Sequence, residues 1–291
     1  MPIALVTGAA GSVGREVVVG LVMRGWSVKA FDLPSCDFSS LENRSGVEVI
    51  RGDITERSSL ASAGSVDTVV HLAALLPPVS EHDRERTFEV NVEGTRYLLE
   101  ACAAAAWGGE MPHFVLASSV ATYGDTSGEE PPVRSDHPQR PLDIYGDSKV
   151  AAEKLVLASG VSFTVLRIAP ISVPAILEPP EVWPFGPEQR VEFIARSDAV
   201  LALLNSMGND AAKNRVLNVT GGPTWQVLGG QYVANMYEIL GLDPAEARYR
   251  DGPGWFDWYE SAESEAILGY QRTSYQEFLR QLRQVAEEEF A

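Results

Sequence analysis

The feature that most constrains this chain is a short apolar run that leads directly into a glycine-rich turn and then into helical spacing. The run covers residues 3–6, the turn residues 7–14, and apolar residues recur at the helical period over residues 17–22. The same alternation continues, with further apolar runs at residues 27–31, 47–50, 68–71, 113–117, 163–166 and 215–219. Strands that alternate with helices pair in parallel, with helices on both faces of the sheet. The pattern predicts an α/β fold with a doubly wound parallel sheet.

Between these runs, residues 87–106 and 149–158 are rich in helix-forming residues and are predicted to be helices. The sequence pattern changes near residue 170, because prolines interrupt the apolar stretch at residues 170–187. Helical patterns resume afterwards, at residues 198–204, 231–240 and 275–289.

This change of pattern indicates that the chain folds into two parts of unequal size. We expect a nucleotide-binding domain formed by residues 1–169, to which residues 197–220 return. Residues 170–196 and 221–291 are expected to form a smaller C-terminal substrate lobe, with a ligand cleft between the two parts.

Composition excludes several classes of partner. The chain has 23 Lys plus Arg against 40 Asp plus Glu, a net charge of −17, which disfavours binding to nucleic acids and to anionic membranes. The two cysteines, Cys36 and Cys102, have no metal-ligand spacing and are too few for a disulfide scaffold. No stretch approaches the roughly 20 apolar residues that cross a bilayer. We expect a soluble, cytoplasmic protein with no nucleic-acid partner, membrane partner or metal.

The glycine turn has the spacing of a phosphate-binding turn. Gly8, Gly11 and Gly14 follow a strand and precede a helix, so the helix start, with Ser12 and Val13, would face a pyrophosphate. The next apolar run ends at Asp32, where a carboxylate accepts both hydroxyls of an adenosine ribose and repels a 2′-phosphate. The pattern therefore predicts NAD in preference to NADP. The alternative is an ordinary glycine-rich turn with a surface aspartate.

Two further strand ends complete this predicted cofactor site. Asp53 and Ile54 follow the third run, where the Asp53 carboxylate would accept a bond from the adenine amino group; the alternative is that Asp53 caps a loop or a helix. Leu72, Ala73 and Ala74 follow the fourth run, and the two alanines are small enough to let a cofactor approach the backbone. His71, just before them, is predicted to be a packed core residue.

A phenol and an ammonium lie one helical turn apart at Tyr145 and Lys149. A nearby cation stabilises phenolate, and this lets a tyrosine exchange protons near neutral pH. Ser119 lies at the end of the fifth run, where its hydroxyl could hold a substrate oxygen opposite Tyr145. The alternative for Ser119 is a serine-rich strand end that makes local backbone bonds.

Taken in order along the chain, these motifs resemble the extended short-chain dehydrogenase/reductases, and specifically the NAD-dependent epimerase/dehydratase family. The resemblance rests on the glycine turn, Asp32, Asp53, His71–Ala74, Asn91–Thr95, Ser118–Gly124, Tyr145–Lys149 and Leu166–Arg167. It implies a Rossmann-type domain and makes Tyr145 the general acid/base. Lys149 would lower the pKa of Tyr145 and bind the nicotinamide ribose, and Ser119 would orient the reacting oxygen.

The resemblance also places Asn91 near the cofactor, although a helix-interior asparagine can equally bond to the backbone. Family members pair through two helices, so a homodimer through residues 87–106 and 149–158 is implied.

The C-terminal part departs from the nucleotide-sugar enzymes of this family. Arg167 lacks the Asn and Gly-Pro that commonly follow it there, and Val191 stands in place of a usual arginine. Arg190 and Arg196 could substitute as substrate-binding residues together with Arg167, or could be solvated surface charges. Aromatic residues of this part could stack on a sugar or form its core, namely Trp183, Phe185, Trp255, Phe256 and Trp258.

The sequence therefore predicts an NAD-dependent enzyme that abstracts hydride from a secondary alcohol of a sugar or nucleotide-sugar substrate, as an epimerase does. One alternative is an NAD-dependent dehydrogenase or reductase of a non-nucleotide hydroxy compound. A second is a non-enzymatic NAD-sensing regulator, which the joint presence of Tyr145 and Lys149 disfavours.

Overall fold

The computed structural model describes residues 1–61, 65–104 and 111–290, and the chain divides by its contacts into two compact units. The first unit contains Met1–Ser118, Asp143–Arg167 and Val200–Leu217. The second contains Ser119–Leu142, Ile168–Ala199 and Asn218–Ala291. The division differs from the predicted domain boundaries because residues 119–142 group with the second unit.

Within the described residues, a seven-stranded sheet has the order β10-β6-β5-β4-β1-β2-β3. Its strands are β1 (Ile3–Thr7), β2 (Ser27–Asp32), β3 (Val47–Arg51), β4 (Thr68–His71), β5 (His113–Ser119), β6 (Phe163–Ile168) and β10 (Arg215–Val219). β1 pairs in parallel with β2 on one side and with β4 on the other. The parallel pairing continues to β3 and to β5. The order reverses between β1 and β4, which is the switch point where doubly wound sheets bind ligands.

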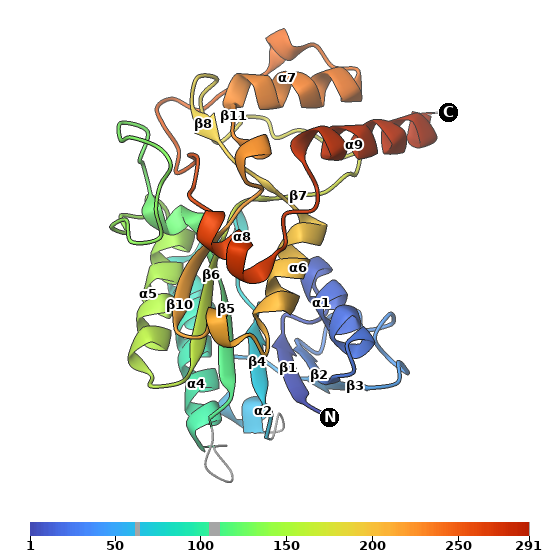
Figure 1. The fold of residues 1–291 in the computed structure, drawn as a ribbon, viewed down its shortest axis with the longest axis vertical. Helices are drawn as coiled ribbons and strands as arrows, with labels where there is room; N and C mark the ends of the chain where they lie inside the picture. The colour runs from blue at the N-terminus through green and yellow to red at the C-terminus, as the bar shows by residue number, and fades with distance from the viewer. Residues whose placement is uncertain (62–64, 105–110, 291) are drawn as a thin grey trace. The chain divides into compact units, whose positions relative to one another are not determined.

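Helices cover both faces of this sheet, as predicted. Figure 1 shows α1 (Ser12–Met23) on one side, and α4 (Gly94–Ala104) and α5 (Ile144–Ala158) on the other. Because both faces are covered, the central strands β1, β4 and β5 are buried along most of their length; Leu5, Val69 and Phe114 belong to one buried cluster. The predicted Rossmann-type fold is confirmed.

The predicted helix at residues 87–106 lies in an unbroken helical segment, but this segment contains a π-helical turn. It comprises α3 (Arg84–Phe88), a π-helical turn, η2 (Glu89–Glu93), and α4, which ends at Ala104. Residues 105 and 106 of the prediction lie outside the described part of the chain. The short α2 (Arg57–Ala61) and the 3₁₀ turn η1 (Val79–Glu81) had no clear sequence signal.

The second unit is built around aromatic residues. Two small sheets pair β8 (Arg190–Val191) with β11 (Val227–Leu228), and β7 (Ile171–Ser172) with β9 (Ile194–Ala195). Its helices are α7 (Gly229–Leu240), α8 (Ala262–Leu268) and α9 (Tyr275–Phe290), and 3₁₀ turns lie at Val120–Tyr123, Pro223–Trp225 and Pro244–Glu246. Helix α6 (Arg196–Ser206) and the turn Asp210–Ala212 lead back into the first unit. Trp183, Phe185 and Phe256 lie in the buried core, so the core alternative for these aromatics is confirmed.

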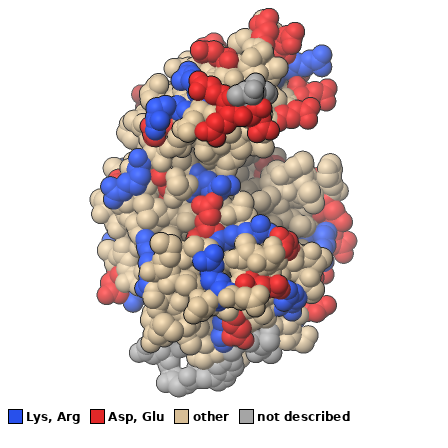
Figure 2. All heavy atoms as spheres, turned by 90° about the vertical axis from the view of Figure 1, so that its right-hand side faces the viewer, with Lys and Arg blue, Asp and Glu red and all other residues tan. Residues whose placement is uncertain are grey.

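Acidic side chains gather at the C-terminal end of α9, where Glu287, Glu288 and Glu289 are exposed (Figure 2). On the face of the first unit that the same view shows, acidic and basic side chains are mixed. In the described part of the chain, no helix has the length and apolar character that a membrane span requires.

Candidate active site

The glycine turn between β1 and α1 is packed so closely that two of its glycines leave no room for a side chain. Gly8 has a φ of +71°, and a Cβ on it would lie 2.8 Å from the backbone nitrogen of Ala73. A Cβ on Gly14 would lie 2.1 Å from the carbonyl oxygen of Gly8. Helix α1 starts at Ser12, and its N-cap residue, Gly11, offers no side-chain cap, so its first N–H groups can serve an anionic ligand.

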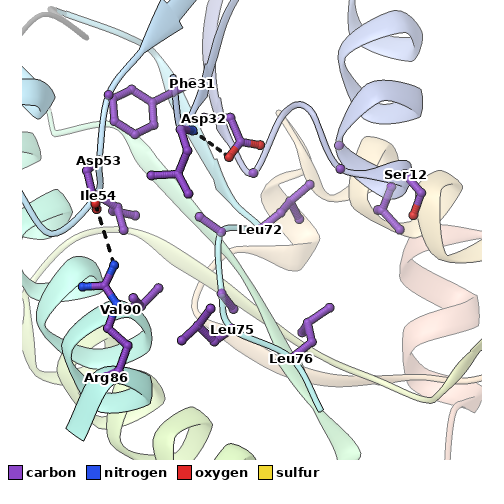
Figure 3. A pocket seen from close by; sticks show the side chains of 18 residues that line it. Ser12, Phe31, Asp32, Asp53, Ile54, Leu72, Leu75, Leu76, Arg86 and Val90 are labelled. Atoms are coloured by element: carbon purple, nitrogen blue, oxygen red, sulfur yellow. Dashed lines mark hydrogen bonds and ion pairs between the residues drawn. The ribbon is translucent and has the colours of Figure 1, made fainter. Parts of the chain in front are cut away.

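Eleven of the fourteen predicted cofactor residues come together around one cavity of about 310 Å³ in the first unit (Figure 3), whereas Asn91, Tyr145 and Lys149 are not part of its lining. The predicted residues that line it are Gly8, Gly11, Ser12, Val13, Gly14, Asp32, Asp53, Ile54, Leu72, Ala73 and Ala74. The lining also includes Phe31, Leu33, Gly52, Leu75, Leu76, Arg86 and Val90, which sequence reasoning missed. A cavity that joins a glycine turn to two strand-end carboxylates has the donor and acceptor groups that NAD requires.

Asp32 is held at the cavity wall by two backbone N–H groups. Its Oδ2 accepts a bond from the Ala10 nitrogen at 2.9 Å, and its Oδ1 accepts one from the Leu33 nitrogen at 2.9 Å. Each carboxylate oxygen has further acceptor capacity for a ribose hydroxyl. The carboxylate is thus fixed to the turn that precedes α1.

Asp53 lies at another part of the same wall, beside an arginine. Its Oδ1 accepts bonds from the backbone nitrogen and the hydroxyl of Thr55, at 2.9 and 2.7 Å. Its Oδ2 is 3.9 Å from Nη2 of Arg86. Asp53 therefore caps the local turn, as the alternative suggested, and also lines the cavity.

Asn91 lies in the π-helical turn and ties the cavity wall to α5. Its Oδ1 accepts a bond from the Leu75 nitrogen at 2.7 Å, and its Nδ2 donates to the Leu75 oxygen at 3.1 Å. The same Nδ2 donates to the hydroxyl of Ser148 at 2.9 Å. Asn91 is thus bonded to backbone, and that backbone is the wall of the cavity. A π turn at such a position is common near functional sites.

The start of α5 is fixed by two carboxylates. Asp143 accepts a bond from the Gly146 nitrogen at 2.7 Å. Glu81, from the turn η1, accepts bonds from the nitrogens of Ile144 and Tyr145 at 2.9 and 3.0 Å. These contacts fix the first turn of α5, which contains Tyr145. Glu81 lies more than 60 positions away, so no local pattern could have identified it.

Lys149 is buried on the same helix, with its Nζ 5.6 Å from the centre of the Tyr145 ring. The ammonium donates to the carbonyl oxygen of Ala117 at 2.9 Å. Burial lowers the pKa of Lys149 to about 8, and the nearby Glu153 charge opposes that shift. Because this pKa lies above neutrality, Lys149 is mainly a cation at pH 7.

His71 does not belong to this reactive group. Its ring nitrogens bond to the hydroxyls of Thr7 and Thr95 at 2.7 and 2.9 Å. Burial, aided by the charge of Lys149, lowers the pKa of His71 to about 3. The ring is neutral and packed, as predicted.

Arg167 lies in a buried ion pair. Its Nη2 is 2.7 Å from Oε2 of Glu153 and its Nε is 3.0 Å from Oε1, with side chains only 6% and 1% exposed. The hydroxyl of Ser118 donates to the same carboxylate. A side chain held in this way offers little surface to a ligand, so we do not include Arg167 in the substrate site proposed below.

The remaining predicted residues, Ser119, Arg190 and Arg196, lie in the second unit. The Ser119 hydroxyl accepts a bond from the Ala121 nitrogen at 3.1 Å, which is the local backbone bond of the alternative reading. Arg190 pairs with Asp257 through Nε and Nη2 at 2.5 and 2.9 Å. Arg196 is half-buried at the start of α6.

Comparison with known proteins identifies relatives of two kinds. The 3 beta-hydroxysteroid dehydrogenase/Delta 5-->4-isomerase of Mycobacterium tuberculosis is 38% identical over 164 residues, which is 53% of this chain and 42% of that protein. The chain thus matches less than half of that relative's length. The D-erythronate dehydrogenase of Cupriavidus necator is 28% identical over 95% of this chain and 96% of its own.

Among solved structures, MoeE5 in complex with UDP-glucuronic acid and NAD has a TM-score of 0.80 at 29% identity, covering 98% of this chain and 99% of its own. UDP-glucose 4-epimerase from Thermotoga maritima has a TM-score of 0.81 at 23% identity, covering 99% and 100%, and shares the fold. The family model for NAD-dependent epimerases and dehydratases matches residues 4–175, more than half of the chain. The chain therefore belongs to the NAD-dependent epimerase/dehydratase family.

Proposed function

We propose that the protein is an NAD-dependent oxidoreductase that acts on a secondary alcohol of a small polyhydroxy compound such as a sugar or sugar acid. The observation that carries this proposal is the joint presence of the lined cavity and the buried Lys149 beside Tyr145 in one unit. A cofactor-sensing regulator needs the cavity but has no use for a cation that activates a phenol.

The chain's own residues would hold the cofactor as follows. The uncapped start of α1, at Ser12 and Val13, faces the pyrophosphate, and Asp32 accepts the adenosine ribose hydroxyls. Asp53 accepts a bond from the adenine amino group. Bound NAD supplies a hydride acceptor for the carbon that carries the substrate hydroxyl.

Three side chains would handle the substrate proton and oxygen. Tyr145, as phenolate, takes the hydroxyl proton, and the Lys149 ammonium stabilises that phenolate. Lys149 also binds the nicotinamide ribose. The Ser119 hydroxyl donates to the substrate oxygen as it becomes a carbonyl oxygen, and the oxygen of the same hydroxyl accepts a bond from the Ala121 nitrogen.

We favour a substrate without a nucleotide because of how the arginines are used. A sugar diphosphate normally meets basic side chains, yet Arg167 and Arg190 are bound to Glu153 and Asp257. One relative that matches over 95% of this chain is named for D-erythronate, a sugar acid. The second candidate is a nucleotide-sugar epimerase, which the likeness to MoeE5 with bound UDP-glucuronic acid supports.

Replacing Tyr145 with Phe tests the catalytic assignment. We expect Tyr145→Phe to reduce turnover by about 10²- to 10⁴-fold, because the general base is lost, while NADH affinity changes less than about twofold. Tyr97→Phe is the control, since Tyr97 stacks with Arg57 away from the cavity. Unchanged turnover in Tyr145→Phe would refute the assignment.

The substrate is found by a thermal-shift screen in the presence of NAD, with sugar acids and free sugars compared against UDP- and dTDP-sugars. Stabilisation by sugar acids alone supports the first candidate, and stabilisation confined to nucleotide sugars supports the second. NADH release, followed at 340 nm, separates net oxidation from epimerisation.

We also propose a homodimer that pairs α4 and α5 of one protomer with those of its partner. Leu157 on α5 is 48% exposed, which is consistent with a covered position in a dimer. Light scattering that gives only the monomer mass of 31.6 kDa would refute it.

A further inference from the structure

Arg86 on α3 lies at the edge of the cofactor cavity, opposite Asp53 (Figure 3). Its Nη1 donates to Oε2 of Glu89 at 2.6 Å, and its Nη2 is 3.9 Å from Oδ2 of Asp53. The side chain is nevertheless 45% exposed. The guanidinium is thus held from two sides by carboxylates while part of its surface remains available.

The charges around the cavity give this arginine a special position. Of the residues that line the cavity in the described part of the chain, Asp32 and Asp53 carry negative charge and Arg86 alone carries positive charge. The chain as a whole has a net charge of −17. A phosphate-bearing cofactor that enters this field therefore meets one compensating side chain, which keeps its charge because arginine is always protonated.

Besides pairing with carboxylates, neighbouring arginines pack their guanidinium groups on aromatic rings. The guanidinium of Arg84 lies 4.3 Å from the centre of the Phe88 ring, and that of Arg57 lies 4.1 Å from the centre of the Tyr97 ring. Within the described residues, no protein ring lies over Arg86 in this way. The cavity surface next to it is apolar, formed by Ile54 and Val90. A flat aromatic group bound there would face both an apolar wall and a planar cation.

We propose that Arg86 binds the adenine ring of NAD, with its guanidinium plane packed against the purine while Asp53 accepts a bond from the adenine amino group. This inference rests on the proposed binding of NAD. Arginine packs on aromatic faces more readily than lysine because its charge is planar and weakly hydrated. Arg86 would thus contribute affinity for the adenosine half of the cofactor only.

The test compares two probes in the full-length protein by their nicotinamide fluorescence. NADH carries the adenosine half, whereas reduced nicotinamide mononucleotide lacks it. We expect Arg86→Ala to weaken NADH binding by about 5- to 20-fold, in line with a desolvated cation–π contact, and to leave binding of the mononucleotide within twofold of wild type. Arg86→Lys keeps the charge but not the plane and should lose most of the same affinity.

Arg84→Ala is the matched control, because Arg84 lies on the same helix and pairs with Asp147 but does not line the cavity. It should bind both probes within twofold of wild type. The inference is overturned if wild type binds NADH and Arg86→Ala binds it equally well, if the mononucleotide is weakened as much as NADH, or if Lys restores full affinity. Failure of wild type to bind NADH at all would instead refute the proposed function.

Discussion

Charged residues serve different purposes in the two units. In the first unit, Asp32 and Asp53 have backbone partners and still line the cofactor cavity. In the second unit, Arg190 and Asp257 bind each other, and the Arg190 Nη2 also donates to the carbonyl oxygens of Thr126, Ser127 and Glu129. A carboxylate at the end of a parallel strand keeps a ligand-facing position because of the topology of the sheet. An arginine in a loop-rich unit has no such constraint and can be used to hold loops together.

The largest effect on the free energy of unfolding is expected at the buried Glu153–Arg167 pair. This pair is the counterpart, in the first unit, of the Arg190–Asp257 pair in the second. Glu153→Ala should lower the free energy of unfolding by about 3–5 kcal/mol, because it leaves the Arg167 charge buried without its partner. The double variant Glu153→Leu with Arg167→Met should recover most of that loss. Urea denaturation measures both. A loss below about 1 kcal/mol would mean that Arg167 reaches water, and would return it to the candidate substrate residues.

An effect of intermediate size is expected in the pH dependence of the free energy of unfolding, to which a buried group in each unit contributes with opposite sign. In the second unit, Glu192 is buried and accepts bonds from the Gly222 and Tyr259 nitrogens. Burial raises its pKa from 4.5 to about 7. The folded state thus holds the proton more tightly than the unfolded state, so this stabilisation is present at low pH and is lost as the pH rises from about 4.5 to 7. The expected loss between pH 5 and pH 8 is about 2–3 kcal/mol.

His71 in the first unit acts in the opposite direction. Its folded pKa of about 3 lies below the usual 6.5, so its contribution is lost as the pH falls through that window. Subtracting the stability of Glu192→Gln from that of wild type at each pH removes the histidine contribution common to both. A difference that does not change between pH 5 and pH 8 would contradict the prediction for Glu192.

The smallest effect is expected at the Arg190–Asp257 pair. Asp257→Ala should cost about 2 kcal/mol, less than the Glu153 variant, because Arg190 is 21% exposed and can partly rehydrate. NADH affinity should change less than twofold, since the cofactor cavity lies in the first unit. Urea denaturation and NADH titration are the measurements. A tenfold loss of NADH affinity would contradict the assignment of cofactor binding to the first unit alone.

The parts that sequence reasoning predicted well depend on local pattern. β4 and β10 have the predicted bounds, and Tyr145 and Lys149 share one helix as their spacing required. The glycine turn was predictable because two of its positions exclude any side chain. A Cβ at Gly14 would meet the backbone of Gly8, and a Cβ at Gly8 would meet the backbone of Ala73, just after β4.

The parts that were missed depend on contacts between distant residues. Glu81 and Arg86 have no motif of their own, and their importance comes from what the fold places beside them. The π turn within residues 87–106 contains Asn91, whose bonds to Leu75 and Ser148 no helical periodicity reveals. For Arg190 the sequence left two alternatives open, because pairing with Asp257 and binding a phosphate require the same chemistry.

The way the chain divides between the units has a consequence for how the protein is made. Neither unit is a continuous segment: the second begins at Ser119, and the last segment of the first ends at Leu217. The edge strand β10, which completes the sheet, therefore emerges from the ribosome only after much of the second unit has been synthesised. Long-range pairing of this kind slows folding and leaves strand edges exposed in the meantime. Nascent chains in which residues 215–219 are still inside the ribosome should thus depend on chaperones more than chains in which these residues have emerged.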